Sequence, residues 1–247
     1  MRSSTSYLLR RTFAVIALAL LIATGVVVTQ LDALEPQIEA ARVVVQAPRK
    51  QPAVESVDRE TSRPYTGNLS IFEDPRRDQK LQIDRVMDLL GIKEGASVAD
   101  IGAGSGWFTV RAARRVGNSA TVYAVDINSN YLKHIEERVR GEKLPNIRTI
   151  LGKEDDPLLP AKSVDAVLLL KTYHEIAEPI RLLVRAREAM RPGGLLGIID
   201  RNGRGDNHGI DRDVVVDEAA RAGFVLIEEH DFVKPDNMDY FLIFRAR

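Results

Sequence analysis

The stretch VADIGAGSGWF, from Val98 to Phe108, decides the fold class of this chain. An apolar run ends at Asp100, and Gly102, Gly104 and Gly106 follow within five residues. Glycine adopts positive φ angles and leaves room for a ligand against bare backbone, so a glycine-rich turn after a strand is typical of a nucleotide-like cofactor site. The spacing of these glycines indicates which kind of cofactor to expect.

The glycine spacing differs from that of two common phosphate-binding loops. A dinucleotide-binding loop has glycine at its first, third and sixth positions. Here Gly106 stands at the fifth position and Trp107 at the sixth, where a large ring would prevent the close helix–strand contact. No lysine followed by serine or threonine ends the loop, which excludes a P-loop. The loop therefore predicts a different nucleotide-like cofactor.

Segments with strand periodicity and helix periodicity alternate around this loop. The alternation predicts an α/β fold with a doubly wound, mostly parallel, seven-stranded sheet. Only residues 231–239 separate the last two strands, which is too few for a helical crossover, so we expect an antiparallel C-terminal hairpin. Strands are predicted at residues 97–101, 121–125, 147–151, 164–170, 195–199, 225–230 and 240–244, and helices at residues 83–90, 107–116, 129–140, 179–190 and 214–222.

The N-terminal part of the chain has a different composition. Residues 1–11 are basic, residues 12–30 are uncharged and apolar, and residues 31–66 contain scattered prolines that we interpret as a flexible tether before a domain at 67–247. Nineteen helical residues would measure about 28 Å, close to the roughly 30 Å hydrocarbon core of a bilayer. The apolar run is therefore expected to be a transmembrane anchor, or alternatively a secretory signal that is cleaved on export.

Charges beside the apolar run predict the side of the membrane on which the domain lies. Arg2, Arg10 and Arg11 precede the run. Because positive residues favour the cytosolic side, the domain that follows is expected on the periplasmic or extracellular side. The membrane is thus an expected partner through the N-terminal segment.

The composition of the whole chain excludes several classes of site. The chain has 247 residues, a formal net charge of +0, no cysteine and 4 histidines. The missing cysteines exclude disulfides, thiolate metal sites and cysteine nucleophiles. The balanced charge gives no electrostatic footprint for nucleic acid, which is not an expected partner. No metal site is predicted.

Three motifs in this order resemble those of the class I S-adenosylmethionine-dependent methyltransferases. The loop from Asp100 to Gly106 resembles the first motif, Asp126 matches the ribose-binding acid, and the sequence RPGG at 191–194 matches a further motif before the fifth strand. The resemblance covers about residues 83–247 and implies a Rossmann-like methyltransferase fold with S-adenosyl-L-methionine as cofactor. It also implies cofactor contacts at Gly102, Gly104 and Gly106.

The resemblance assigns three acids to the cofactor. Asp126, at the end of the second strand, would accept hydrogen bonds from both ribose hydroxyls, although an acid there can also cap the next helix. Asp100 would lie near the methionyl ammonium. Asp155 is chosen as the acid that accepts from the adenine amino group, with Glu154 and Asp156 as alternatives.

Candidate catalytic residues follow the fourth strand in the segment KTYHEI, residues 171–176. His174 is predicted as a general base with Glu175 orienting it, and Tyr173 completes a Tyr-His-Glu segment that resembles one in bacterial small-molecule methyltransferases. His174 can alternatively have a purely structural hydrogen bond. The glycine-containing stretch 200–209 is interpreted either as a lid, from which His208 could reach the site, or as an ordinary flexible surface loop.

The motifs together imply an enzyme that transfers the sulfonium methyl of S-adenosylmethionine to a small-molecule acceptor by in-line displacement. Such a reaction mainly requires alignment of the nucleophile and exclusion of water. The alternative is a membrane-tethered cofactor-binding or scaffold protein that has the fold but no turnover.

Overall fold

The computed structural model describes residues 60–247, which lie within a unit that runs from Pro52 to Arg247. The predicted basic segment, the predicted anchor or signal at 12–30 and most of the predicted tether lie outside the described residues. Within residues 60–247, no helix combines the length and the apolar character needed to cross a membrane.

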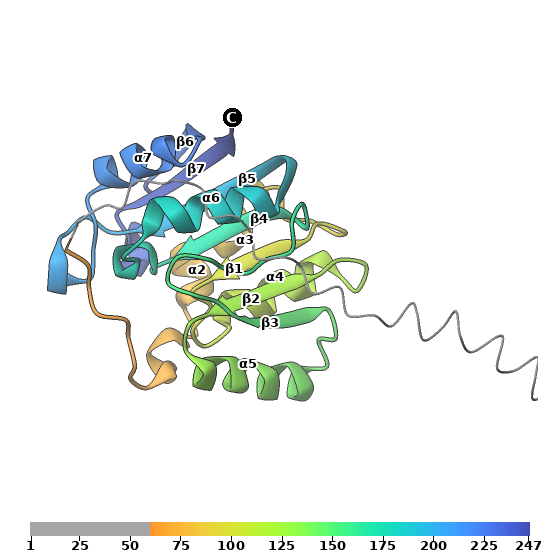
Figure 1. Cartoon of the computed structure of the whole chain (residues 1–247). Coiled ribbons are helices and arrows are strands. Elements are labelled where there is room, and N and C mark those ends of the chain that lie inside the picture. The colour runs from red at the N-terminus through yellow and green to blue at the C-terminus, as the bar shows by residue number, and fades with distance from the viewer. Residues whose placement is uncertain (1–59) are drawn as a thin grey trace, which may run out of the picture. The chain divides into compact units, whose positions relative to one another are not determined.

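Seven strands form one sheet in the order β3-β2-β1-β4-β5-β7-β6 (Figure 1). The first five strands run parallel, and β7 is antiparallel to both of its neighbours. The predicted doubly wound sheet with an antiparallel C-terminal hairpin is therefore confirmed. The strands are β1 (Val98–Ile101), β2 (Val122–Asp126), β3 (Ile147–Leu151), β4 (Val164–Leu170), β5 (Met190–Asp200), β6 (Phe224–His230) and β7 (Tyr240–Ala246).

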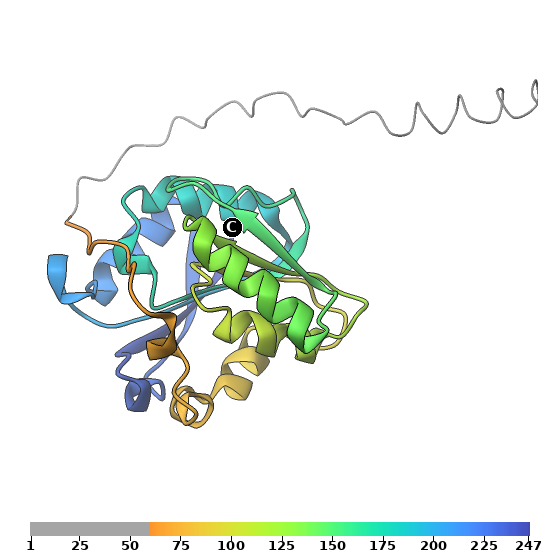
Figure 2. The same ribbon diagram turned by 90° about the horizontal axis from the view of Figure 1, so that it is seen from below.

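Helices cover both faces of the sheet (Figures 1 and 2). Four helices contribute to one hydrophobic core and two to the other, and alternate residues of each central strand enter the two cores. The first set is α2 (Arg77–Leu81), α3 (Ile83–Leu89), α4 (Trp107–Val116) and α5 (Ser129–Glu142), and the second is α6 (Pro179–Ala189) and α7 (Arg212–Arg221). Short 3₁₀ turns are η1 (Leu69–Phe72), η2 (Tyr173–Glu175), η3 (Gly205–Asn207) and η4 (Lys234–Asp236).

The central strand β4 explains why its sequence is almost entirely apolar. Ala166 and Leu168 are buried in one core, while Val167 and Leu169 are buried in the other. A parallel strand covered by helices on both faces needs apolar residues at consecutive positions. This packing places the carboxyl end of β4 in the middle of the sheet edge, beside that of β1.

Strand β5 begins earlier than the sequence predicts. Met190 already pairs with Val164, and a register shift between Val164 and Ala166 absorbs the Pro-Gly-Gly stretch before regular pairing resumes at Leu195. Irregular pairing of this kind leaves no periodic signal in the sequence. At the other end β5 includes Asp200, which the prediction left in the following loop.

Residues 60–68, which we call the strap, lie against the domain although the sequence assigned most of them to the tether. The backbone N–H of Ser62 donates to the carbonyl oxygen of His174 at 3.1 Å. The hydroxyl of Tyr131 on α5 donates to the carbonyl oxygen of Tyr65 at 2.8 Å. The strap therefore connects both sides of the sheet edge at which β1 and β4 end.

Candidate active site

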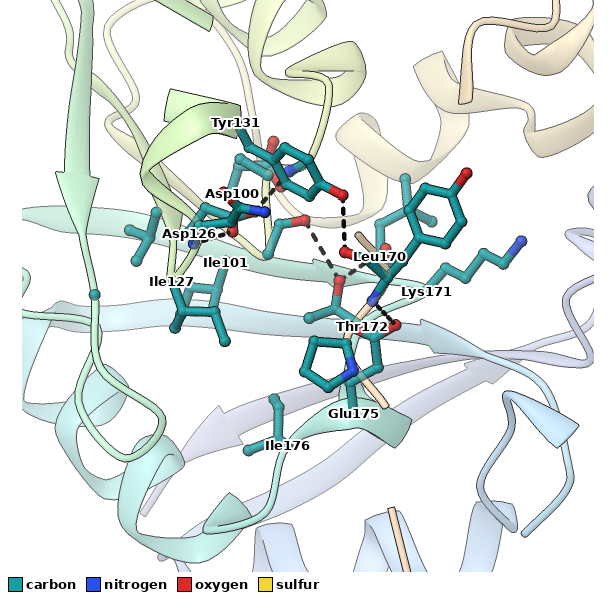
Figure 3. A pocket seen from close by; sticks show the side chains of 18 of the residues that line it. Asp100, Ile101, Asp126, Ile127, Tyr131, Leu170, Lys171, Thr172, Glu175 and Ile176 are labelled. Atoms are coloured by element: carbon teal, nitrogen blue, oxygen red, sulfur yellow. Dashed lines mark hydrogen bonds between the residues drawn. The ribbon is translucent and has the colours of Figure 1, made fainter. Parts of the chain in front are cut away.

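A pocket of about 640 Å³ lies at the carboxyl ends of the parallel strands β1, β2 and β4 (Figure 3). The sheet order reverses between β1 and β4, and open α/β sheets bind ligands in the crevice at such a reversal. The pocket is within the size range of ligand sites, roughly 300–1,000 Å³. The glycine loop forms one wall, and the segment after β4 forms another.

The three glycines of the loop have positive φ angles of 78°, 53° and 74° at Gly102, Gly104 and Gly106. A Cβ atom on Gly102 would lie 2.2 Å from Cγ2 of Thr172, so this glycine allows close packing of β1 on the segment after β4. A Cβ atom on Gly104 would meet nothing within 4 Å. The space beside Gly104 therefore belongs to the pocket, where a ligand can approach the backbone.

Asp126 connects the end of β2 to the glycine loop. Its Oδ2 accepts from the backbone N–H of Gly104 and its Oδ1 from that of Asn128, both at 2.9 Å. Asn128 itself caps α5, because its Oδ1 accepts from the N–H of Asn130 at 3.0 Å. Asp126 is therefore not needed as a helix cap. Burial raises the pKa of Asp126, and its carboxylate oxygens have further lone pairs for a ligand.

Asp100 is 2% exposed at the end of β1, and burial raises its pKa to about 7. The Thr109 hydroxyl donates to its Oδ2 at 2.6 Å and partly offsets that burial. A buried carboxylate without a cationic partner in hydrogen-bond contact favours a cationic group placed beside it. The pocket thus has an acid suited to a ligand ammonium.

The choice of Asp155 as the adenine-binding acid is wrong in position. Asp155 does not line the pocket, and its carboxylate pairs with Arg181 of α6 at 3.3 Å. An isolated bridge between Lys153 and Asp156 forms a tight turn after β3, and Glu154 is the acid of that turn that lines the pocket. Of the three acids considered, only Glu154 lies where a ligand in the pocket could reach it. Which acid such a turn directs inward depends on its backbone geometry and not on the sequence spacing.

Two of the three predicted catalytic residues do not line the pocket. Tyr173 is fully buried, and its hydroxyl donates to Oε2 of Glu218 at 2.8 Å, so it does not line the site. His174 is 3% exposed and is not among the lining residues either. The prediction that Glu175 orients His174 is also wrong. Asp200 is the acid that orients His174, because its Oδ1 lies 2.9 Å from Nδ1 of His174.

Glu175 alone of the predicted catalytic residues lines the pocket. Its Oε1 accepts from the backbone N–H of Tyr65 at 3.3 Å, and burial raises its pKa to about 7. Lys171 lines the same wall, and burial lowers its pKa. Figure 3 shows Glu175, Thr172 and Lys171 on the side of the pocket opposite Asp126. This wall provides polar groups away from the glycine loop.

Several residues in or beside the pocket could not be predicted from the sequence. Tyr65 and Tyr131 lie at the pocket although they are 66 residues apart, and only tertiary contacts bring them together. Arg77 and Arg111 have their guanidinium groups 4.5 and 4.0 Å from the centroid of the Trp107 ring. No local pattern marks these residues. Asp200 had a detectable signal, because it is an acid at the end of β5, the strand next to β4.

The sheet order, the glycine loop and the acid at the end of β2 together define a methyltransferase domain of the class I S-adenosylmethionine-dependent type. A family model described as "Methyltransferase domain" matches residues 98–194. The matched residues thus have the sequence features of a methyltransferase domain, which implies S-adenosylmethionine as the cofactor.

Relatives and solved structures agree with this classification. A demethylmenaquinone methyltransferase from Geobacillus stearothermophilus is 28% identical over 120 residues, which are 49% of this chain and 51% of the relative. Nocamycin O-methyltransferase from Saccharothrix syringae is 28% identical over 114 residues, 46% of this chain and 41% of the relative. The chain thus spans about half the length of the curated relatives it matches.

One solved structure, a SAM-dependent methyltransferase from Aquifex aeolicus, superimposes with a TM-score of 0.66 at 23% identity. The alignment covers 72% of this chain and 97% of that protein, so it supports the fold. None of these similarities supports membrane association or the alternative of a membrane-tethered scaffold protein.

The residues of the pocket fit S-adenosylmethionine. The open side of Gly104 leaves room for the cofactor at the backbone, and Asp126 has free acceptor capacity at the end of β2. The buried hydroxyl of Ser105, in the same loop, has no hydrogen-bond partner in the described part of the chain and is available to a ligand. The donor set of the loop is therefore compatible with the cofactor.

Proposed function

We propose that this protein transfers the methyl group of S-adenosylmethionine to a small-molecule acceptor. The observation that carries the proposal is a pocket with two polar walls. One wall contains Asp126, which is hydrogen-bonded to Gly104, and the opposite wall contains Glu175. The first wall has the features of a nucleoside site. The second provides room and polar groups for an acceptor.

Each acid on the cofactor wall has a distinct role in the proposal. Asp126 accepts hydrogen bonds from the ribose hydroxyls, Asp100 meets the ammonium group, and Glu154 accepts from the adenine amino group. Charge-assisted hydrogen bonds of this kind are roughly twice as strong as neutral ones. S-adenosylmethionine, when bound, supplies a methyl group already activated by its sulfonium.

The other wall positions the acceptor and excludes water. Glu175 accepts a hydrogen bond from a polar group of the acceptor and so helps to align it. Tyr65 and Tyr131 connect the strap to α5 across the pocket and reduce access of water. Alignment and exclusion of water are the main requirements for transfer from an activated methyl group.

A small-molecule acceptor is supported by two observations. The pocket of about 640 Å³ holds a nucleoside cofactor together with only a limited acceptor surface. Both relatives named above are methyltransferases whose names specify small molecules, demethylmenaquinone and nocamycin. A phenol or quinol is therefore a suitable first acceptor class for testing.

Cofactor binding is tested by titrating the full chain with S-adenosylhomocysteine in a calorimeter. We expect binding by the native protein, and a loss of at least about tenfold in affinity for Asp126→Ala, since a charged hydrogen-bonding group is removed. Asp217→Ala is the matched control, because the side chain of Asp217 is 70% exposed on α7. No binding by the native protein, or equal binding by both variants, would overturn the cofactor assignment.

Turnover is tested separately with methyl-labelled S-adenosylmethionine and a panel of phenols, quinols and amines. The expected result is label transfer to at least one acceptor with stoichiometric S-adenosylhomocysteine. Tight cofactor binding without transfer to any of them would contradict the proposed reaction and leave only the cofactor site.

A further inference from the structure

Two of the four histidines of the chain meet beside Glu175, which lines the pocket. The rings of His174 and His208 have centroids 5.8 Å apart at an interplanar angle of 84°. Glu175 is adjacent, and one ligand atom from each of these three side chains lies within 4.8 Å of the other two. We propose that His174, Glu175 and His208 bind a divalent transition-metal ion, and that Zn²⁺ is the ion this set fits best.

Asp200 prepares His174 for this role. Both oxygens of its buried carboxylate lie close to Nδ1 of His174, at 2.9 and 3.0 Å. Because a carboxylate accepts and does not donate, Nδ1 has the proton and Nε2 has the free lone pair. Nε2 lies 3.8 Å from Oε1 of Glu175. Histidine ligands of metals are commonly held by a carboxylate in this way, which fixes both tautomer and ring orientation.

The donor set selects the class of ion. Two imidazoles and one carboxylate are borderline ligands that suit Zn²⁺ and other first-row metals, whereas Mg²⁺ and Ca²⁺ prefer oxygen donors only. The chain has no cysteine, so no thiolate site competes for the ion. Three protein ligands leave a fourth position open in a tetrahedral zinc site, as is usual where zinc has a catalytic role.

The spacing is close to that of a tetrahedral site. Zinc bonds of roughly 2.0–2.1 Å place neighbouring ligand atoms about 3.4 Å apart. The separation of 3.8 Å between His174 and Glu175 already approaches this value. The upper limit of 4.8 Å requires an adjustment of about 1.4 Å, and the side chain of His208 is exposed and can make it.

Contacts between distant segments hold the ligands together. Arg201 donates through Nε to the carbonyl oxygen of His208 at 2.8 Å and also to that of Asn207, which fixes the loop that contains His208. Ser62 of the strap, 1% exposed, donates its N–H to the carbonyl oxygen of His174 and its hydroxyl to that of Gly205. Figures 1 and 2 both show the start of the strap beside this loop.

The location of the cluster connects it to the pocket. Glu175 is the one proposed ligand that lines the pocket, so a bound ion lies at the wall assigned to the acceptor. This part of the inference rests on the proposed function: the open coordination position would hold a polar group of the acceptor. No metal was expected from the sequence, since the chain has no cysteine and only 4 histidines, and His174 and His208 are 34 positions apart.

Zinc binding is measured on the full chain after treatment with EDTA, by titration with Zn²⁺ in competition with a chromogenic chelator and without S-adenosylmethionine. We expect one Zn²⁺ per chain. His208→Ala and Glu175→Gln should each weaken binding at least about tenfold. His134→Ala is the matched control, because His134 is exposed on α5, and His230→Ala is a second, because His230 pairs with Glu228. Both controls should leave the affinity within about twofold.

Two further measurements separate a metal site from a general loss of structure. Co²⁺ should give a tetrahedral visible spectrum in the native protein and in His134→Ala but not in His208→Ala. Asp200→Asn should weaken zinc binding by roughly 10- to 100-fold, as expected for a positioning residue. S-adenosylhomocysteine binding, measured on each variant, reports whether the fold is retained.

The outcomes distinguish this inference from the proposed function. A native protein that binds S-adenosylhomocysteine but no Zn²⁺ at micromolar concentration would overturn the metal site and leave the methyltransferase proposal intact. Equal zinc affinities of His208→Ala and His134→Ala would also overturn it. Zinc binding without S-adenosylhomocysteine binding would support the metal site and contradict the proposed cofactor.

Discussion

The carboxylate of Asp126 and the backbone N–H of Gly104 are joined by a hydrogen bond of 2.9 Å. This bond ties the end of β2 to the middle of the glycine loop after β1. The residue proposed to hold the ribose therefore also fixes the backbone that must approach the cofactor. A substitution of Asp126 is consequently expected to change both the stability of the loop and the affinity for the ligand.

The coupling predicts that Asp126→Asn lowers both stability and cofactor affinity. An amide has one oxygen, so it cannot accept from both Gly104 and Asn128 as the carboxylate does. We expect the free energy of unfolding to fall by about 1–3 kcal/mol and the affinity for S-adenosylhomocysteine to fall at least about tenfold. Urea denaturation and calorimetry measure the two effects, and Asp217→Asn should show neither. A normal affinity with reduced stability would mean that Asp126 only fixes the loop.

Asp100 predicts a pH dependence of stability in the ligand-free protein. Its pKa is about 7 in the folded protein, compared with the ordinary value of 3.8 expected in the unfolded chain. Between pH 3.8 and pH 7 the folded state therefore binds more protons than the unfolded state. Stability should therefore fall as the pH rises from about 4 to about 7. Burial is the main cause, while the charge of Asp126 raises this pKa further and that of Arg77 lowers it. Urea denaturation over this range should give a shallower slope for Asp100→Asn.

The same carboxyl group predicts proton release when the cofactor product binds. With a pKa of about 7, Asp100 is roughly half protonated at pH 7, and contact with a ligand ammonium favours the ionised form. Binding of S-adenosylhomocysteine at pH 7 should therefore release about half a proton. Calorimetry in two buffers with different ionisation enthalpies measures this number. If Asp100→Asn released as many protons as the native protein, Asp100 would not be the group that responds.

Gly104→Ala should impair cofactor binding more than it impairs folding. Gly104 and Gly193 both have positive φ angles, 53° and 83°, and a Cβ atom on either would meet nothing within 4 Å. Each substitution should cost about 1–2 kcal/mol of stability through backbone strain. Only Gly104 faces the pocket, so only Gly104→Ala should lose affinity for S-adenosylhomocysteine. Equal affinities of the two variants in calorimetry would show that the cofactor does not approach this part of the loop.

The fold was predictable because its signals are local. The apolar β4 and the acids that end β1 and β2 follow from periodicity and from the rule that parallel strands end at one edge of a sheet. Asp126 was found correctly as a pocket residue for this reason. The number of strands followed from the alternating periodicity, and the antiparallel β7 from the short connection before it.

The acceptor side of the site was less predictable because it depends on loops. Asp200 contacts His174 from the neighbouring strand β5, although the two residues are 26 positions apart in the sequence. Glu175 was predicted in its place because it is the acid next to His174 in the sequence. Neighbouring residues in a 3₁₀ turn point in different directions, so proximity in sequence did not imply contact with the same cavity. Contacts of Tyr65 depend on how the strap folds back, for which no periodic signal exists.

The buried position of Tyr173 changes its expected role from catalytic to structural. Its fully buried hydroxyl donates to Glu218 at 2.8 Å, and the residue does not line the pocket. Tyr173→Phe should lower the free energy of unfolding by about 1–3 kcal/mol, since it leaves a buried carboxylate without this donor. The melting temperature should fall by roughly 2–4 °C for each kcal/mol, which calorimetric scanning measures.

The matched control is Tyr123→Phe, on β2, where the tyrosine is partly buried against the same core as Tyr173. It should change the melting temperature far less. Affinity for S-adenosylhomocysteine and the rate of methyl transfer should stay within about twofold of the native values in both variants, because neither hydroxyl reaches the reacting groups. A stable Tyr173→Phe protein with greatly reduced methyl transfer and normal cofactor affinity would instead restore the catalytic role predicted from the sequence, and would require the segment after β4 to rearrange when the acceptor binds.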